Sequence, residues 1–215
     1  MSASLGGESS VTSRTYSGLS ASERDAERRS RLLAAGRELI GTQGYAAVSV
    51  EKLCAASKVS SRHFYQLYEN KEAAFLDVYD SITKQSLDSA VASLEATEGE
   101  PMMQRIPKAF LAYVGPMVED IRAARIAFVE IMGASPLIEQ RRLSYRELLV
   151  DLVVSEGAAA VQRGELVDRD FRFATLALTG AANAIVYDWT LREDREDSAA
   201  LEAQLTELAL DLLAR

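Results

Sequence analysis

Apolar positions along this chain recur mainly at intervals of three and four residues, the spacing that gathers side chains on one face of an α-helix. In segment 25–43 the positions that follow this spacing are Leu32, Leu33, Gly36, Leu39 and Ile40. Ser20 and Ser22 precede them, each with an acid three positions on, as at a helix N-cap. No run of alternating β-branched residues is bounded by turn signals. The pattern predicts an all-α fold.

Two short helices follow the first one. Gly41 and Gly44 end the first helix, and Ser49 can cap a second whose inner face is Val50, Leu53 and Cys54. The segment Ser57-Lys58-Val59 then reads as a tight turn. This arrangement is the first half of a helix-turn-helix.

Ser60 can cap a third helix, in which Phe64, Leu67 and Tyr68 share the buried face. The opposite face carries Ser61, Arg62, Tyr65 and Gln66. In a major groove, the first residues of such a helix would meet base edges, while its amides and the Tyr65 hydroxyl would meet phosphates. Asn70 can cap a long fourth helix from Lys71, with Phe75, Val78, Tyr79 and Ile82 on one face. We expect this helix to link the DNA-binding module to the rest of the chain.

Charge supports this interpretation although the chain carries a net charge of -8. DNA binding draws on cationic side chains, so the total alone argues against a nucleic-acid partner. Between residues 28 and 62, however, seven basic residues stand against two acidic ones. The sequence therefore predicts a basic module on an acidic body.

The combined spacing of this module resembles the N-terminal signature of the tetracycline-repressor (TetR) family over about residues 25 to 87. The matching positions are Gly44-Tyr45, Ser49, Val50 to Ala56, Val59-Ser60, Phe64-Tyr65, Tyr68 and Lys71-Glu72. The resemblance implies that Ser61, Arg62, His63, Tyr65 and Lys71 line a DNA-binding face, with His63, Tyr65 and Lys71 on the phosphates. The full set of expected DNA contacts is Ser49, Lys58, Ser60, Ser61, Arg62, His63, Tyr65, Gln66 and Lys71.

Three positions depart from the family pattern. Lys58 stands where glycine is frequent in the turn, so a long side chain must adopt a glycine-tolerant backbone. His63 replaces a common threonine, and Leu67 a polar or aromatic residue. These departures bear on base preference.

Beyond Asn70 the chain reads as about six more helices, divided by breakers at 98–101, 115–116, 133–136, 163–164 and 192–197. The resemblance implies that the last two helices form a four-helix dimer bundle. Small residues lie at Ala177, Gly180, Ala181 and Ala184, and leucines at Leu201, Leu205, Leu208 and Leu212. Both sets suit a helix-helix seam between subunits, and both also fit an intramolecular core.

A ligand cavity is expected among the middle helices, because the family couples DNA binding to a small molecule. The candidate lining is Met103, Phe110, Tyr113, Met117, Phe128, Met132, Tyr145, Asn183 and Trp189. Methionine and aromatic side chains adapt to apolar guests, and Asn183, Tyr113 and Tyr145 can orient one. We expect a small hydrophobic effector, although each residue taken singly also fits an ordinary core.

The small number of cysteine and histidine residues narrows the classes of site that the chain can contain. One cysteine, Cys54, and one histidine, His63, leave no disulfide and no Cys/His zinc site, and no metal or cofactor is expected. Cys54 fits core filler better than a redox sensor. Residues 1–20 resemble neither a signal peptide nor a membrane anchor and are expected to be a disordered tail of a cytoplasmic protein.

The predicted organisation is a tail at 1–20, a DNA-binding domain at 21–87 with its helix-turn-helix at 49–68, and a ligand-binding and dimerisation domain at 88–215. The predicted function is a dimeric regulator, a repressor released from a palindromic operator by its effector. A helical interaction module without DNA binding and a small helical enzyme are the alternatives. No glycine-rich phosphate loop, second histidine or nucleophile-base pair outside the DNA motif supports catalysis.

Overall fold

The computed structural model describes residues 20–133 and 135–214. These residues form nine α-helices and one π-helix and contain no strand, so the all-α prediction is confirmed. The elements are α1 (Ala21–Gln43), α2 (Val50–Ser57), α3 (Ser61–Leu67), α4 (Lys71–Ala96), α5 (Met102–Val118), α6 (Ile121–Ala124), the π-helix η1 (Arg125–Glu130), α7 (Pro136–Gln162), α8 (Phe171–Leu191) and α9 (Ser198–Leu213). The tail predicted for residues 1–20 lies outside the described residues except for Ser20.

Side chains cap the first four helices where the sequence predicts caps. The Ser20 hydroxyl accepts from the Glu23 amide at 3.1 Å, and the Glu23 carboxylate accepts from the Ser20 amide at 2.6 Å. Ser49, Ser60 and Asn70 likewise accept the amide three residues on. Each cap satisfies a helix-end donor and stabilises by about 1 kcal/mol. The caps therefore set where each helix of the N-terminal module begins.

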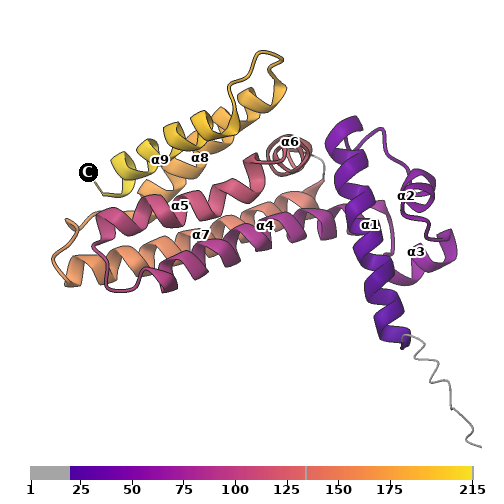
Figure 1. Ribbon diagram of the computed structural model, residues 1–215, viewed down its shortest axis with the longest axis horizontal. Helices are drawn as coiled ribbons and strands as arrows, with labels where there is room; N and C mark the ends of the chain where they lie inside the picture. Colours follow the sequence, from indigo (N-terminus) through magenta and orange to yellow (C-terminus); the bar gives the residue numbers. More distant parts are fainter. Residues whose placement is uncertain (1–19, 134, 215) are drawn as a thin grey trace, which may run out of the picture.

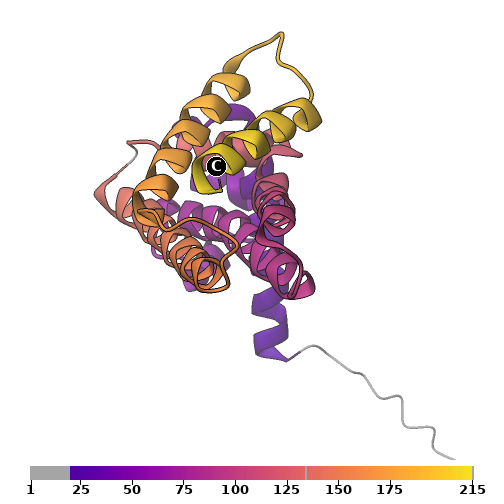
Figure 2. The same ribbon diagram turned by 90° about the vertical axis from the view of Figure 1, so that its left-hand side faces the viewer.

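The helices form a head and an elongated body (Figure 1). In the head, α1 stands between the body and the short helices α2 and α3. The body is built from α4, α5, α7, α8 and α9, and the C-terminus lies at the end remote from the head. Figure 2, seen from that end, shows the orange and yellow helices α8 and α9 lying above α4, α5 and α7. Helix α4 belongs to both parts and runs through residue 87 without a break, so the boundary expected there stays a prediction.

One hydrophobic core runs from the head into the body. It contains Leu32, Phe64 and Phe75 of the head together with Ile126 of η1 and Leu205 of α9. The predicted inner face of α4 is confirmed, because Phe75, Val78, Tyr79 and Ile82 are all buried. A second cluster around Met102, Ala160 and Leu178 fills the far end of the body.

The break predicted at Gly115-Pro116 is wrong, since α5 continues to Val118 and contains Pro107 and Pro116. A proline inside a helix costs about 3 kcal/mol through its missing hydrogen bond and its ring. Helix α5 packs between α4 and α9 and buries Ile106, Val114, Met117 and Val118. Each such side chain contributes about 1.5 to 3 kcal/mol, so packing outweighs the two prolines.

The two candidate dimer helices use their small and apolar residues differently. On α9, Leu201 and Leu205 are fully inside this chain's own core, and Leu208 and Leu212 are partly buried against it. On α8, Gly180 and Ala184 face solvent. Leu201 and Leu205 of α9 are therefore used inside this chain, Leu208 and Leu212 keep part of their surface exposed, and α8 keeps an open face, so the dimer role of both helices stays a prediction.

Candidate DNA-binding surface and ligand cavity

Helix α3 divides its residues between core and solvent as an amphipathic recognition helix does. The Phe64 side chain is 0% exposed and the Tyr65 side chain 58% exposed. Ser61, Arg62 and Gln66 are exposed beside Tyr65. The Phe64 ring packs between Tyr65 and Tyr68, with ring centroids 5.3 and 5.5 Å away. The polar face that the sequence assigns to DNA is thus held outward by an aromatic anchor beneath it.

The N-cap of α3 also positions His63. The Ser60 hydroxyl lies 2.8 Å from Nδ1 of His63 and accepts the His63 amide at 3.3 Å. This contact holds the imidazole against the first turn of α3 and leaves Nε2 as its outer nitrogen. The Ser60 and Ser49 hydroxyls each accept a backbone amide at a helix N-cap. No contact with DNA is shown for either, so their predicted DNA contacts stay predictions.

The turn between α2 and α3 has a left-handed backbone at Lys58, the position where the family pattern frequently has glycine. Lys58 has φ 55° and ψ 36°, and it is the only non-glycine residue with positive φ in the described part of the chain. Such a conformation costs about 1 to 2 kcal/mol for a residue with a Cβ. The exposed Lys58 side chain stays free to reach outward, and its carbonyl accepts from Arg31 at 3.5 Å.

Lys71 has a structural task besides the phosphate contact that the family resemblance implies. Its Nζ donates to the carbonyls of Tyr45 and Val48, each at 3.0 Å, and lies 4.1 Å from the centre of the Tyr45 ring. These contacts close the loop between α1 and α2 onto the start of α4. The phosphate contact stays a prediction, with one ammonium proton left for it.

Asp77 of α4 forms hydrogen bonds with two other parts of the head. It accepts from Arg29 of α1 at 2.7 Å and from the Tyr68 hydroxyl at 2.6 Å. Burial alone would raise the pKa of the Asp77 carboxyl, but the hydrogen bonds from Arg29 and Tyr68 outweigh burial and lower it. One carboxylate therefore links α1, the end of α3 and α4.

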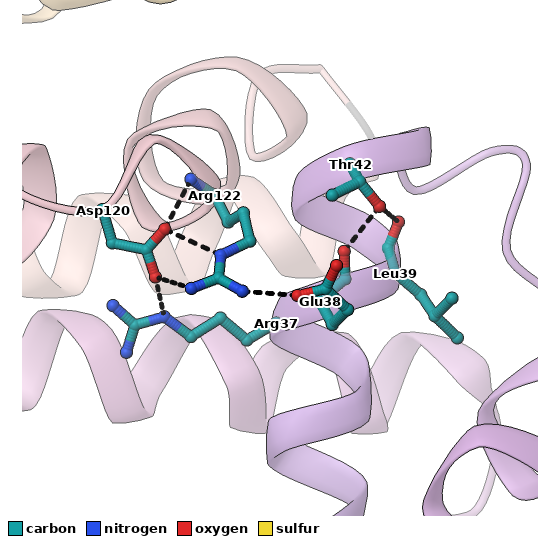
Figure 3. A network of polar contacts seen from close by, with 6 residues as sticks. All are labelled: Arg37, Glu38, Leu39, Thr42, Asp120 and Arg122. Atoms are coloured by element: carbon teal, nitrogen blue, oxygen red, sulfur yellow. Dashed lines mark hydrogen bonds and ion pairs between the residues drawn. The ribbon is translucent and has the colours of Figure 1, made fainter.

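A polar network joins α1 to the start of α6 (Figure 3). Asp120 accepts from Arg37 Nε at 3.0 Å and from Arg122 Nε at 2.8 Å, and Arg122 also pairs with Glu38. Burial acts to raise the pKa of Asp120, yet the Arg122 hydrogen bonds and the two guanidinium charges prevail and lower it. A Cβ on Gly41 would lie 2.4 Å from the Cβ of Arg122, so only glycine permits this approach.

The π-helix η1 makes a second connection between head and body. Glu130 accepts the Tyr45 amide at 2.8 Å and Arg125 Nε at 2.9 Å. Arg125 also donates to the Thr42 carbonyl at 3.3 Å. Phe128 of the same element lines the cavities described next. The sequence did not reveal these contacts, because charged residues in helices usually form solvated surfaces.

The body contains an apolar cavity of about 120 Å³, walled by residues of α4, α5, η1, α7, α8 and α9. A smaller cavity of about 60 Å³ adjoins it and has polar residues in its wall. Seven of the predicted lining residues border one or both cavities: Phe110, Tyr113, Met117, Phe128, Met132, Tyr145 and Asn183. Ligand binding by these residues stays a prediction.

Two predicted lining residues lie elsewhere. Met103 is 42% exposed, and its neighbour Met102 borders the large cavity instead, because one residue turns a helix face by about 100°. Trp189 is buried in the core, and its indole N–H donates to the Glu196 carbonyl at 2.8 Å. On the α7 wall, sequence reasoning found Tyr145 but missed Arg142, Arg146 and Gly157, since α7 shows no clear apolar stripe.

Residues 20–133 and 135–214 offer no candidate for a metal site or a membrane span. No group of three or more His, Cys, Asp and Glu side chains is placed to hold a metal ion there. None of the described helices combines the length and apolarity needed to cross a bilayer. Cys54 is buried in the head's core, as filler would be.

Comparison with known proteins agrees with this geometry. Residues 32–78 match the model of the bacterial regulatory proteins of the tetR family. This match covers the head of the chain, from within α1 into α4, and identifies a TetR-type domain there. No curated protein matches the chain.

Solved structures show that the TetR-like fold extends over the body. The fatty acid degradation regulator FadR from Bacillus halodurans is 16% identical, with a TM-score of 0.76 over 87% of this chain and 97% of that one. FadR from Bacillus subtilis, in complex with stearoyl-CoA, is 18% identical, with a TM-score of 0.74 over 84% and 96%. A tetR-family regulatory protein from Rhodococcus RHA1 is 22% identical, with a TM-score of 0.65 over 87% and 97%.

Proposed function

We propose that this TetR-family chain is a cytoplasmic repressor that binds a palindromic operator as a homodimer and releases it on binding a small hydrophobic effector. The observation that carries the proposal is the outward polar face of α3. Ser61, Arg62 and Tyr65 are exposed above the buried Phe64, so three groups able to bind bases or phosphates project from one short, anchored helix.

The exposed face of α8 supports the dimer. Phe173, Ala177, Gly180, Ala184, Tyr187 and Leu191 follow one another at spacings of four, three, four, three and four residues. Phe173 is 70% and Leu191 53% exposed, and Gly180 has open space before it. A two-fold axis would pair this stripe with itself, with small residues letting the helices approach and large ones packing at both ends. The α9 leucines are already used inside each subunit.

The contacts of η1 support communication between effector and DNA. Phe128 borders both cavities, while Glu130, two residues on, holds the Tyr45 amide at the head. Helix α4 offers a second route, since it begins at Lys71 in the head and borders the large cavity at Ala90 and Leu94. Movement of either wall would change the position of the head. Linkage then requires that operator weaken effector binding by the factor by which effector weakens operator binding.

The cavities support a hydrophobic effector. The large cavity is walled almost entirely by apolar side chains, with Asn183 and Thr179 among its few polar ones. The Bacillus subtilis relative was solved with stearoyl-CoA, which is a property of that protein. It supports the proposal by showing that this fold accommodates a ligand with an apolar chain.

Binding-site selection from random duplex DNA, followed by gel-shift titration, tests the DNA-binding role. Arg62→Ala should lose about 1 to 3 kcal/mol of discrimination between selected and random sequences. Lys71→Ala should weaken both sequences alike. Lys84→Ala, on an exposed part of α4, is the matched control and should leave both affinities unchanged. Failure of low-salt selection to enrich any sequence would contradict the proposal.

A further inference from the structure

We propose that the two cavities form one binding site for an amphipathic anion, with a short apolar chain in the large cavity and a carboxylate head group in the small one. The proposal rests on the effector site proposed above and names the chemistry of its ligand. It starts from the opposite character of the two cavities.

The two cavities adjoin. Both are bordered by the same five residues, Tyr113, Phe128, Leu149, Thr179 and Asn183. Among the residues that the structure describes, none forms a hydrogen bond with the Tyr113 hydroxyl or the Asn183 side-chain amide. A polar group inside a protein costs free energy until it finds a partner. A ligand crossing the shared wall would supply that partner.

Charge distinguishes the two ends. Glu156 is the charged residue in the wall of the large cavity, and it pairs with the buried Arg105 at 3.3 Å. The small cavity has two charged wall residues, and both are arginines, Arg142 and Arg146. An anionic head group is therefore favoured at the small cavity and disfavoured at the Glu156 end.

Arg146 is the better anion ligand of the two. Arg142 donates twice to Glu139, at 2.9 and 2.6 Å, whereas Arg146 makes a single 3.3 Å contact with Glu147. The Arg146 Nε is buried without a hydrogen-bond partner in the described part of the chain. Glu139 and Glu147 hold their arginines from outside the wall, so no carboxylate of the wall itself opposes an incoming anion.

The size of the large cavity limits the chain. Its volume of about 120 Å³ is close to that of an engineered cavity of roughly 150 Å³ that binds benzene. Benzene has six carbons, so about six chain carbons would fill the large cavity, and the carbons next to the head group of a slightly longer chain would lie in the adjoining small cavity. A much longer acyl chain would have to move helices of the body apart.

Calorimetric titration of the full chain with sodium octanoate, octanol and octylamine tests the assignment. The three probes share a chain and differ in the head group. Octanoate should bind at least tenfold more tightly than octanol and still more tightly than octylamine. Arg146→Gln should abolish the preference for octanoate over octanol, and Tyr113→Phe should weaken both. Lys84→Gln, which removes an exposed positive charge, is the control and should retain the wild-type preference.

The outcomes separate this proposal from the effector site itself. Equal binding of octanoate and octanol, or an unchanged preference in Arg146→Gln, would overturn the anionic head group while leaving a hydrophobic effector in place. Binding of none of the three probes to a folded chain would overturn both. Gel shifts on the selected operator in the presence of each probe show independently whether the DNA-binding role stands.

Discussion

The head and the body of this chain differ in how completely side chains fill their cores. The head has a cavity of about 10 Å³ between Leu32, Tyr68 and Val78, which is at the limit for one water molecule. The body holds about 120 and 60 Å³ in two adjoining cavities. The head, in which α3 is the proposed DNA-binding helix, is filled, whereas the body, which holds the proposed effector site, keeps space. Within one continuous core, the tightly packed head is therefore the more rigid part and the body with its cavities the more adaptable one.

Removing one aromatic ring from each part should show the largest contrast. Phe64→Ala should destabilise the protein by about 3 to 5 kcal/mol, because a fully buried ring leaves a cavity in a filled core. Phe128→Ala should cost clearly less, since its ring already borders empty space. Urea denaturation followed by circular dichroism measures both. Equal losses would mean that the body is packed as tightly as the head.

The Asp77 carboxylate should contribute measurably to the stability of the head. Asp77→Asn should cost about 1 to 2 kcal/mol at pH 7, because Arg29 and Tyr68 lose a charged acceptor. Since folding lowers the pKa of Asp77, its contribution is fully present above the unfolded value of about 3.9 and disappears as pH falls through the lower folded value.

Urea midpoints of wild type and Asp77→Asn should therefore differ at pH 7 and converge toward pH 3. Asp88→Asn, at an exposed pair with Lys84, provides the control and should shift the midpoint little at either pH. A constant difference across this range would show that the carboxylate's charge is not the source of the stability.

A substitution at Glu130 tests whether effector binding in the body is coupled to operator binding by the head. Glu130→Gln keeps an acceptor for the Tyr45 amide but removes the charge that holds Arg125. It should reduce the effect of a bound effector on operator affinity about threefold, roughly 0.7 kcal/mol of coupling, while effector affinity for the free protein changes little. Paired titrations with and without operator measure the coupling. Unchanged coupling in Glu130→Gln, as expected for the exposed control Glu95→Gln, would leave α4 as the route.

The sequence predicted the head better than the body for a physical reason. Capping is local, so Ser49, Ser60 and Asn70 could be placed from neighbours within three residues. The wall of a cavity depends on which faces of distant helices meet, and Met102 took the place predicted for Met103.

Contacts between distant segments left no sequence signal at all. Arg37 and Asp120 are 83 residues apart, and each taken alone resembles ordinary surface charge. The leucines of α9 showed the right spacing but not the partner, because a seam within one chain and a seam between two chains require the same side chains. At Pro116 the sequence predicted a helix break that does not occur. The local preference of proline against helix is overridden there by the packing of α5 against α4 and α9.

The π-helical turn of η1 determines which way the side chains of this segment point. Residues five apart in an α-helix point about 140° away from each other, whereas the i to i+5 turn brings them into line. Arg125 and Glu130 are five apart and meet at 2.9 Å, which leaves Phe128 to face the opposite way, into the cavities. Deleting one residue between them would restore the narrower coil and make this an i, i+4 pair, which an ordinary α-helix also brings onto one face, so the pair could persist while Phe128 changed direction. The additional residue of the π-turn therefore sets the direction in which Phe128 points relative to the ion pair, so that one short segment contacts the head with Glu130 and the cavities with Phe128.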